Sequence, residues 1–239
     1  MASRTPIDPR PAKHFRVVLG ATCYADAEGA LSLAVALARQ VEAELHGLLV
    51  RDEGILTAAG RPRARVVTYS GDQASAISRT EMLRAYEADA RRFEERLTGL
   101  ARTARVAARF NALEGRLSEV VLQSSGQGDV VILGFRRAMR DSGSVVLVLG
   151  KGHQPPAFAA PLAAGLGKRL VVLCASDEDR PAALHSEFET RRFHDREELL
   201  RQLETLSPAA VIIAADPGTL PATGRVLDAA RCPVVVTTD

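Results

Sequence analysis

The sequence predicts an α/β protein built on a doubly wound parallel sheet. Short runs of β-branched and aliphatic residues end in glycine, as in Arg16–Gly20 and Asp129–Gly134, and this composition is typical of strands buried on both faces of a parallel sheet. Between such runs lie longer segments whose apolar residues recur at helical spacing. Strands alternating with helices form right-handed βαβ units. The alternation starts again in the C-terminal part, which predicts a degenerate internal duplication.

The first βαβ unit occupies the beginning of the chain. Its first strand is Arg16–Gly20, and its second strand is Ala43–Val50. Asp26 is the predicted N-cap of the helix between them, because an aspartate side chain accepts hydrogen bonds from free N–H groups of the first turn. The apolar face of this helix is predicted to comprise Ala30, Leu33, Ala34, Leu37, Ala38 and Val41.

The pattern breaks after the second strand, where glycine and proline interrupt the chain at 51–80. We interpret this stretch as an insertion, because it is long for a connection between sheet elements. The predicted elements that follow are a helix, a strand, a short helix and two buried strands: Glu81–Thr103, Val106–Asn111, Ser118–Ser125, Asp129–Gly134 and Val145–Leu149.

A change of composition marks the predicted boundary between two units. The stretch 153–167 is rich in proline, glycine and alanine, which indicates a linker. We therefore expect a complete unit over 1–152 that includes the insertion, and a shortened second unit over 168–239. The elements expected in the second unit are strands at Arg169–Cys174, Glu187–Phe193, Ala210–Ala214 and Pro233–Thr237, with helices at Arg196–Leu206 and Thr223–Ala230.

Composition excludes several classes of function. The 239 residues carry a net charge of +2 and only 4% aromatic side chains, so the chain lacks both the positive field and the stacking surfaces that nucleic-acid binding needs. No apolar run approaches the roughly 20 residues of a membrane span, so we expect no membrane insertion, and no secretory signal is recognised at the N-terminus. The cysteines Cys23, Cys174 and Cys232 form no metal-binding pattern. A cytoplasmic, reducing location is predicted.

Three segments resemble the universal stress protein family. They are RVVLGATCYADAEGALSLAVALARQVEAELHGLLV near the beginning, GRLSEVVLQSSGQGDVVILGFRR in the middle and GRVLDAARCPVVVTTD at the end. The resemblance implies two universal-stress-like units, of the adenine nucleotide alpha hydrolase-like kind. In that family the last strand commonly mediates pairing between units, so the resemblance also implies pairing of the two units within the chain, or a homodimer. It specifies a fold more firmly than an activity.

The nucleotide-binding members of this family carry an acidic residue after the first strand, and a glycine-rich loop, G-x-x-G followed nine residues later by G-[ST], which wraps the phosphates. This sequence departs from both elements: no acid follows the first strand until Asp26, and Arg137 replaces the second glycine. If a cofactor binds, the resemblance implies ATP, and the candidate site residues are Ala21, Thr22, Val50, Gly134, Arg136, Arg137, Gly143 and Ser144. Either these residues form a shortened anion loop with arginine forks, or the loop is an ordinary basic surface loop.

No catalytic residues are predicted. Cys23 lies near a helix N-terminus, which could lower its pKa. No histidine is assigned beside it, and the alternative is a small buried or half-buried thiol. The predicted function is therefore a non-catalytic regulatory protein of the stress response, which acts through a protein partner and has a degraded nucleotide-binding motif. The alternatives are an adenine-nucleotide sensor with at most slow ATPase activity, and a regulatory partner of a membrane transporter.

Overall fold

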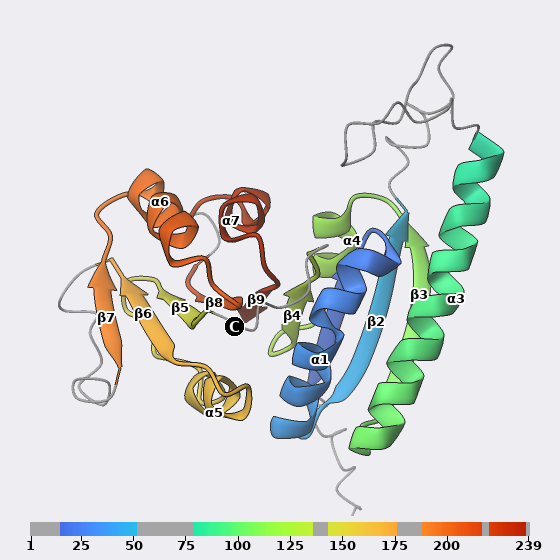
Figure 1. Cartoon of the computed structure of the whole chain (residues 1–239), viewed down its shortest axis with the longest axis horizontal. Coiled ribbons are helices and arrows are strands. Elements are labelled where there is room, and N and C mark those ends of the chain that lie inside the picture. The colour runs from blue at the N-terminus through green and yellow to red at the C-terminus, as the bar shows by residue number, and fades with distance from the viewer. Residues whose placement is uncertain (1–14, 52–78, 136–142, 176–187, 217–219, 238–239) are drawn as a thin grey trace, which may run out of the picture.

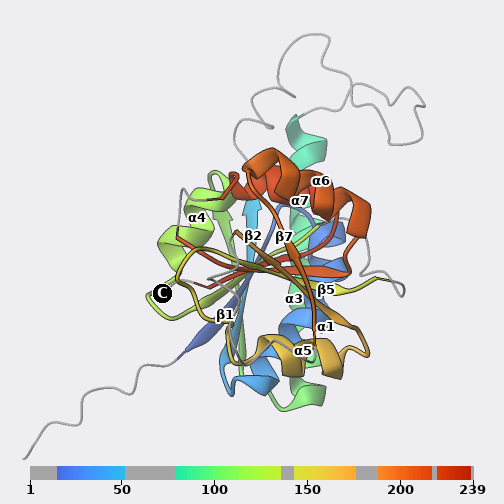
Figure 2. The ribbon, with the colours of Figure 1, turned by 90° about the vertical axis from the view of Figure 1, so that its left-hand side faces the viewer.

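The protein forms a single sheet covered by helices on both faces (Figures 1 and 2). The computed structural model describes residues 15–51, 79–135, 143–175, 188–216 and 220–237. Over these residues the sheet has nine strands in the order β3-β2-β1-β4-β9-β8-β5-β6-β7. The strands are β1 (Arg16–Ala21), β2 (Glu44–Arg51), β3 (Ala108–Glu114), β4 (Val130–Leu133), β5 (Val145–Leu149), β6 (Leu170–Cys174), β7 (Glu189–Arg192), β8 (Ala210–Ala214) and β9 (Val234–Thr237). The predicted α/β fold with a doubly wound sheet is confirmed.

The helices bury their apolar stripes on two sides of this sheet. The helices are α1 (Tyr24–Gln40), α3 (Arg79–Ala104), α4 (Leu117–Ser124), α5 (Ala159–Gly165), α6 (Arg196–Leu206) and α7 (Thr223–Ala230). One continuous apolar cluster joins α1, α3 and α5 to one face of the sheet. On the other face, α6 and α7 pack on the strands of the C-terminal part, and α4 packs on β1, β2 and β4. The result is a three-layer arrangement.

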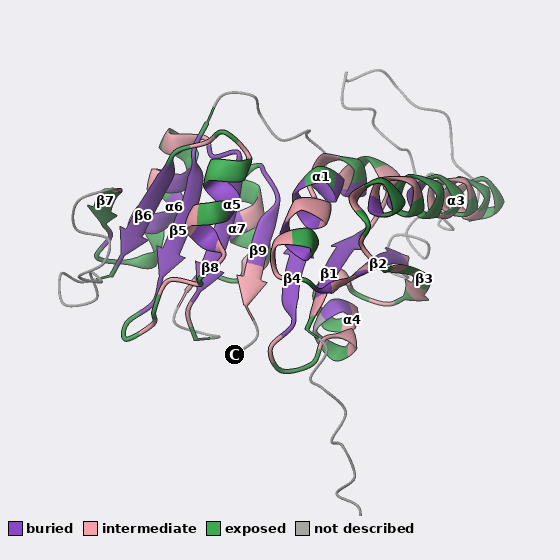
Figure 3. Cartoon of the chain, turned by 90° about the horizontal axis from the view of Figure 1, so that it is seen from below, coloured by how far each residue is buried: buried purple, intermediate pink, exposed green. Residues whose placement is uncertain are grey.

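The composition of each strand matches its place in the sheet. The central strands β4, β5, β6 and β8 consist of aliphatic residues, apart from Cys174, and every one of their residues is buried. The outermost strands β3 and β7 contain many polar and charged residues, and they are the most exposed strands (Figure 3). A strand needs apolar residues on both sides only where helices cover both sides, and this requirement ends at the edges.

One antiparallel pair in the middle of the sheet joins its two halves. Neighbouring strands are parallel except β4 and β9. In this pair Val130 lies opposite Thr237 and Leu133 lies opposite Val234. Residues more than a hundred positions apart therefore share one ladder, and the carboxyl ends of β1 to β4 lie at the same edge of the sheet as the amino ends of β5 to β9.

Two expectations differ from the structure. The stretch 153–167, expected to be a linker, contains α5, because its alanine-rich segment buries Ala159, Leu162 and Ala163. It joins β5 to β6 within the C-terminal part of the sheet, where β5 pairs with β6 and β8. Asp26 is not the N-cap of α1: that position is Cys23, and Asp26 lies inside the first turn. The insertion expected at 51–80 falls almost wholly outside the described residues.

Candidate functional site

The carboxyl ends of β1 and β4 form the candidate ligand-binding site. In doubly wound sheets, ligands bind where neighbouring strands connect in opposite directions, and β1 lies between β2 and β4. The structure brings three predicted site residues together here. Ala21 ends β1, Thr22 follows it, and the backbone N–H of Gly134 donates to the carbonyl oxygen of Gly20 at 2.9 Å.

The other predicted residues are distributed differently. Val50 lies near the end of β2 and is buried in the cluster under α4, with Val121 and Leu133. Arg136 and Arg137 lie outside the described residues. The predicted pair of residues before β5, Gly143 and Ser144, is separated from β4 by β9 and β8, which corresponds to roughly 14 Å at about 4.8 Å per strand.

Gly143 and Ser144 pack on the connection between α6 and β8. Ser144 is buried, and its carbonyl oxygen accepts a hydrogen bond from Ala209 N–H at 2.9 Å. Gly143 has φ +130°, and a Cβ there would lie 3.0 Å from the carbonyl oxygen of Ser207. Glycine is needed at this position for both its backbone conformation and the close approach.

The N-terminus of α1 is capped by a carboxylate from another helix. The backbone N–H of Tyr24, the first helical residue, donates to Asp89 Oδ2 on α3 at 3.0 Å. Cys23 occupies the N-cap position and makes no side-chain cap hydrogen bond. Within the same first turn, Asp26 Oδ2 accepts from the Thr22 hydroxyl at 2.7 Å. The positive end of the helix dipole therefore meets two carboxylates of the protein itself.

The segment after β4 lies directly on this first turn of α1. A Cβ added to Gly134 would lie 2.5 Å from the carbonyl oxygen of Asp26 and 3.4 Å from the backbone nitrogen of Ala27. A glycine is required because any side chain would collide with backbone atoms. The glycine that the sequence suggested for phosphate approach thus serves the contact between β4 and α1.

The thiol of Cys23 is not activated. Its pKa is raised from 9.0 to about 11, mainly by burial and also by the nearby carboxylates of Asp26 and Asp89, while the Asp26 backbone acts in the lowering direction. The expectation of a lowered pKa at a helix N-terminus is wrong, because these carboxylates and burial outweigh the helix dipole. At neutral pH the sulfur is a protonated, weakly nucleophilic thiol.

Sequence reasoning missed Asp89. It lies 65 positions from Tyr24, in the middle of a helix whose exposed face is full of charged residues. No local signal separates it from the other acidic residues of α3, and only the packing of α3 on α1 singles it out. In the structure Asp89 lies on the half-buried side of α3.

The described residues contain neither a candidate metal-binding cluster nor a candidate membrane-spanning helix. Across the described ranges, no group of three or more histidine, cysteine, aspartate or glutamate side chains is placed to hold a metal ion. None of the helices in the described part is both long and apolar enough to cross a membrane.

Comparison with known proteins gives only structural matches. No protein-family model and no curated protein matches the chain. A universal stress protein from Archaeoglobus fulgidus is similar to it at 11% identity and a TM-score of 0.45, over 93% of this chain and 96% of that one. A protein from the universal stress protein family from Burkholderia pseudomallei is similar at 14% identity and a TM-score of 0.33, over 77% of this chain and 100% of that one. The chain's own strands and helices define the class, a doubly wound α/β protein, and its structural neighbours include universal stress proteins.

Proposed function

We propose that the protein is a universal-stress-like regulatory protein that acts through contacts with another protein and does not turn over nucleotide. The observation that carries this proposal is the hydrogen bond between the Tyr24 N–H and the Asp89 carboxylate, 3.0 Å long. This hydrogen bond lies at the N-terminus of α1, beside the carboxyl ends of β1 and β4.

A helix N-terminus binds phosphate because its first N–H groups are free and its dipole attracts an anion. Here the Asp89 carboxylate accepts from the N–H of the first helical residue, Tyr24, and the Asp26 carboxylate lies in the same first turn. A phosphate at this place would have to displace one carboxylate and would be repelled by the other. Like charges this close are costly even with partial exposure to water, so the arrangement supports a degraded nucleotide site.

We further infer that the chain consists of two universal-stress-like units that meet where β9, the last strand of the second unit, pairs with β4 of the first. The strands β1 to β4 lie in the order β3-β2-β1-β4, and the strands β5 to β8 lie in the same relative order, β7-β6-β5-β8. The pairing of β5 with β6 and β8 supports a boundary ahead of Val145 in place of one at 153–167. The second unit then has five strands and the first has four.

The outer edges of the sheet support a role in protein contacts. Within the described residues, β3 pairs on one side only, with β2, and β7 pairs on one side only, with β6. An unpaired strand edge is a template for an added strand of a partner. The edge at β3 is the longer one, with seven residues from Ala108 to Glu114.

Thermal unfolding with millimolar MgATP tests the proposal. A ligand at about a hundred times its dissociation constant stabilises a protein by roughly 2.7 kcal/mol, so we expect no shift for the wild-type chain. The variant Asp89→Asn keeps an acceptor for the Tyr24 N–H and removes the charge, so it is the variant in which any latent response should emerge. A shift in the wild type would contradict the proposal and favour the adenine-nucleotide sensor.

The partner class needs a separate experiment. Chemical crosslinking of the full chain in its native cells, followed by mass spectrometry, would identify what contacts β3. Recovery of a membrane transporter as the dominant partner would favour the third alternative, a regulator of that transporter.

A further inference from the structure

We propose that a cavity at the junction of β4 and β9 is a binding site for an uncharged, mainly apolar small molecule. The cavity has a volume of about 340 Å³, inside the range of about 300 to 1,000 Å³ typical of small-molecule sites. It lies where β1 and β4 begin and β9 ends, at the opposite edge of the sheet from the carboxyl ends of β1 and β4. The inference goes beyond the proposed regulatory function, because it assigns a ligand to a second site.

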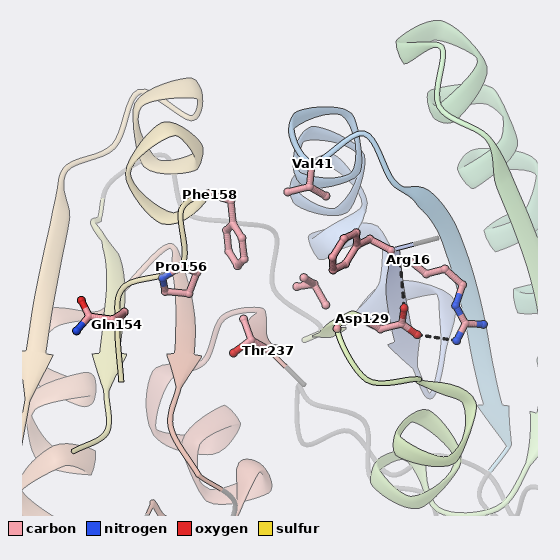
Figure 4. A pocket seen from close by; sticks show the side chains of 10 residues that line it. Arg16, Val41, Asp129, Gln154, Pro156, Phe158 and Thr237 are labelled. Atoms are coloured by element: carbon pink, nitrogen blue, oxygen red, sulfur yellow. Dashed lines mark hydrogen bonds and ion pairs between the residues drawn. The ribbon is translucent and has the colours of Figure 1, made fainter. Parts of the chain in front are cut away.

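Both halves of the chain supply the walls (Figure 4). From one half come the apolar side chains of Phe15, Val41 and Val130, and from the other come Pro156, Phe158 and Thr237. In Figure 4 the side chains of Phe158, Pro156 and Thr237 face Val41 and Asp129 across the cavity. Such a site exists only while the two halves share one sheet.

The walls are held in place by two contacts across the junction. Val130 and Thr237 lie opposite each other in the β4–β9 ladder. The Gln40 side chain, at the end of α1, donates from Nε2 to the carbonyl oxygen of Phe158 at 2.9 Å. Because a backbone ladder fixes the floor and a hydrogen bond fixes the Phe158 segment, the cavity is preformed, which lowers the entropic cost of binding.

The side chain of Phe15 lines the cavity and is partly exposed to solvent. Phe15 is 56% exposed, and among the described residues no other large hydrophobic side chain is exposed. Its ring lies against Gly128, where an added Cβ would be 3.1 Å from ring carbon Cε1. An exposed apolar side chain beside a cavity marks a place where a ligand or partner removes apolar surface from water.

The charges of the lining cancel each other. Asp129 is buried, and its carboxylate accepts from Arg16 Nη2 at 2.6 Å, from the Arg16 backbone N–H at 3.1 Å and from the Gly126 N–H at 2.7 Å. The same Nη2 also donates to the Ser124 carbonyl oxygen at 3.2 Å. A charged ligand would lose its hydration without gaining an unpaired counter-ion in this lining, so the site selects an uncharged one.

One polar group of the lining can orient the ligand. The Thr237 hydroxyl donates to the Ile213 carbonyl oxygen at 3.5 Å, which is a long hydrogen bond. The hydroxyl oxygen keeps lone pairs that accept a hydrogen bond. The ligand class is therefore an uncharged molecule with an aromatic or aliphatic body and a hydrogen-bond donor that can reach the Thr237 hydroxyl.

The neutral fluorophore N-phenyl-1-naphthylamine has this chemistry and serves as the probe. Titrated into the full chain, it should show saturable binding with enhanced fluorescence. We expect Phe158→Ala to weaken binding about tenfold, because it removes an aromatic wall. Thr237→Phe should fill the cavity and remove saturable binding. Thr98→Phe, which adds the same ring to an exposed position of α3, should leave the affinity unchanged.

Several outcomes would overturn the proposal. Absence of saturable binding to the wild type, or equal affinity for a Thr237→Phe variant that unfolds cooperatively, excludes the cavity as the site. Saturable binding that appears only after residues 2–12 are deleted would mean that this segment of the chain is the occupant. Tighter, Thr237-sensitive binding of the anion 1-anilinonaphthalene-8-sulfonate would contradict selection of an uncharged ligand. The MgATP experiment reports on the other edge of the sheet, so the two proposals can fail separately.

Discussion

The carboxylate of Asp89 accepts a hydrogen bond from the backbone N–H of Tyr24, although the two residues lie on different helices. This contact fastens α3 to the beginning of α1 and supplies the cap that Cys23 does not. It also puts a carboxylate at the N-terminus of α1, beside the carboxyl ends of β1 and β4. One side chain thus links two helices and places a negative charge at the positive end of the α1 dipole.

Replacing Asp89 should separate its hydrogen bond from its charge. Asp89→Ala removes the cap and should lower the free energy of unfolding by about 1 kcal/mol. Asp89→Asn keeps an acceptor and should cost less than half of that. Urea unfolding of both variants measures the difference. Glu94→Ala, on the exposed face of α3, is the matched control and should be nearly neutral; an equal loss in that control would argue against a capping role.

Gly134→Ala should destabilise the protein through the contact between β4 and α1. The new Cβ would lie 2.5 Å from the Asp26 carbonyl oxygen, and because both sides are backbone, the strain should cost about 1–3 kcal/mol. Gly99→Ala is the control, since nothing lies within 4 Å of a Cβ at that helical position; it should raise stability by about 0.5–1 kcal/mol. Thermal unfolding would show opposite signs. The same sign for both would contradict the close approach.

Asp129→Ala should be among the more damaging single changes. It removes the carboxylate that accepts from the N–H groups of Arg16 and Gly126 and that forms the ion pair with the Arg16 guanidinium. Loss of a buried charged acceptor costs about 3 kcal/mol. Glu197→Ala breaks the exposed ion pair with Arg225 and should cost at most about 1 kcal/mol. Chemical denaturation of both variants tests whether burial makes this difference.

The raised pKa of Cys23 predicts slow alkylation and a stability change at high pH. With a pKa of about 11, the thiol should react with iodoacetamide on the order of a hundredfold more slowly at pH 8 than a free cysteine. Peptide mass spectrometry resolves it from Cys174 and Cys232, and the urea-unfolded chain is the control.

The sign of the stability effect follows from the same pKa. The folded state holds the Cys23 proton more tightly than the unfolded state does, so this stabilisation is complete below about pH 9. It is lost as the pH rises from 9.0 towards 11. Cys23→Ala should flatten this part of the stability curve. A loss of equal size in that variant would assign the effect to other groups.

Local patterns predicted most elements, because their residues leave little choice. The aliphatic run of β8 and the amphipathic helix α6 were both predicted with the bounds that the structure has, Ala210–Ala214 and Arg196–Leu206. A short, continuous aliphatic run predicts a strand buried on both faces, and apolar residues that recur every 3.6 positions predict an amphipathic helix. The bounds of β3 shifted by two to three residues, because its alternating, half-exposed sequence marks its ends weakly.

Partners of elements could not be predicted in the same way. Nothing in Val145–Leu149 distinguishes a strand that pairs with β4 from one that pairs with β6 and β8, since all these runs are equally apolar. The composition of the alanine-rich stretch after it is that of a linker. Its helix, α5, is stabilised by packing on the sheet, which the local sequence does not reveal. At the candidate site, Ala21, Thr22 and Gly134 follow from strand ends, whereas the capping carboxylate comes from a distant helix.

The antiparallel ladder of β4 and β9 also constrains how the chain folds. Until β9 has been synthesised, the aliphatic edge of β4, Val130–Leu133, has no partner on that side. Closing a ladder between segments more than a hundred residues apart is entropically slow. During that interval the unpaired edge of β4 can pair with strands of other chains. A nascent chain that stalls before β9 should therefore depend on chaperones to avoid aggregation.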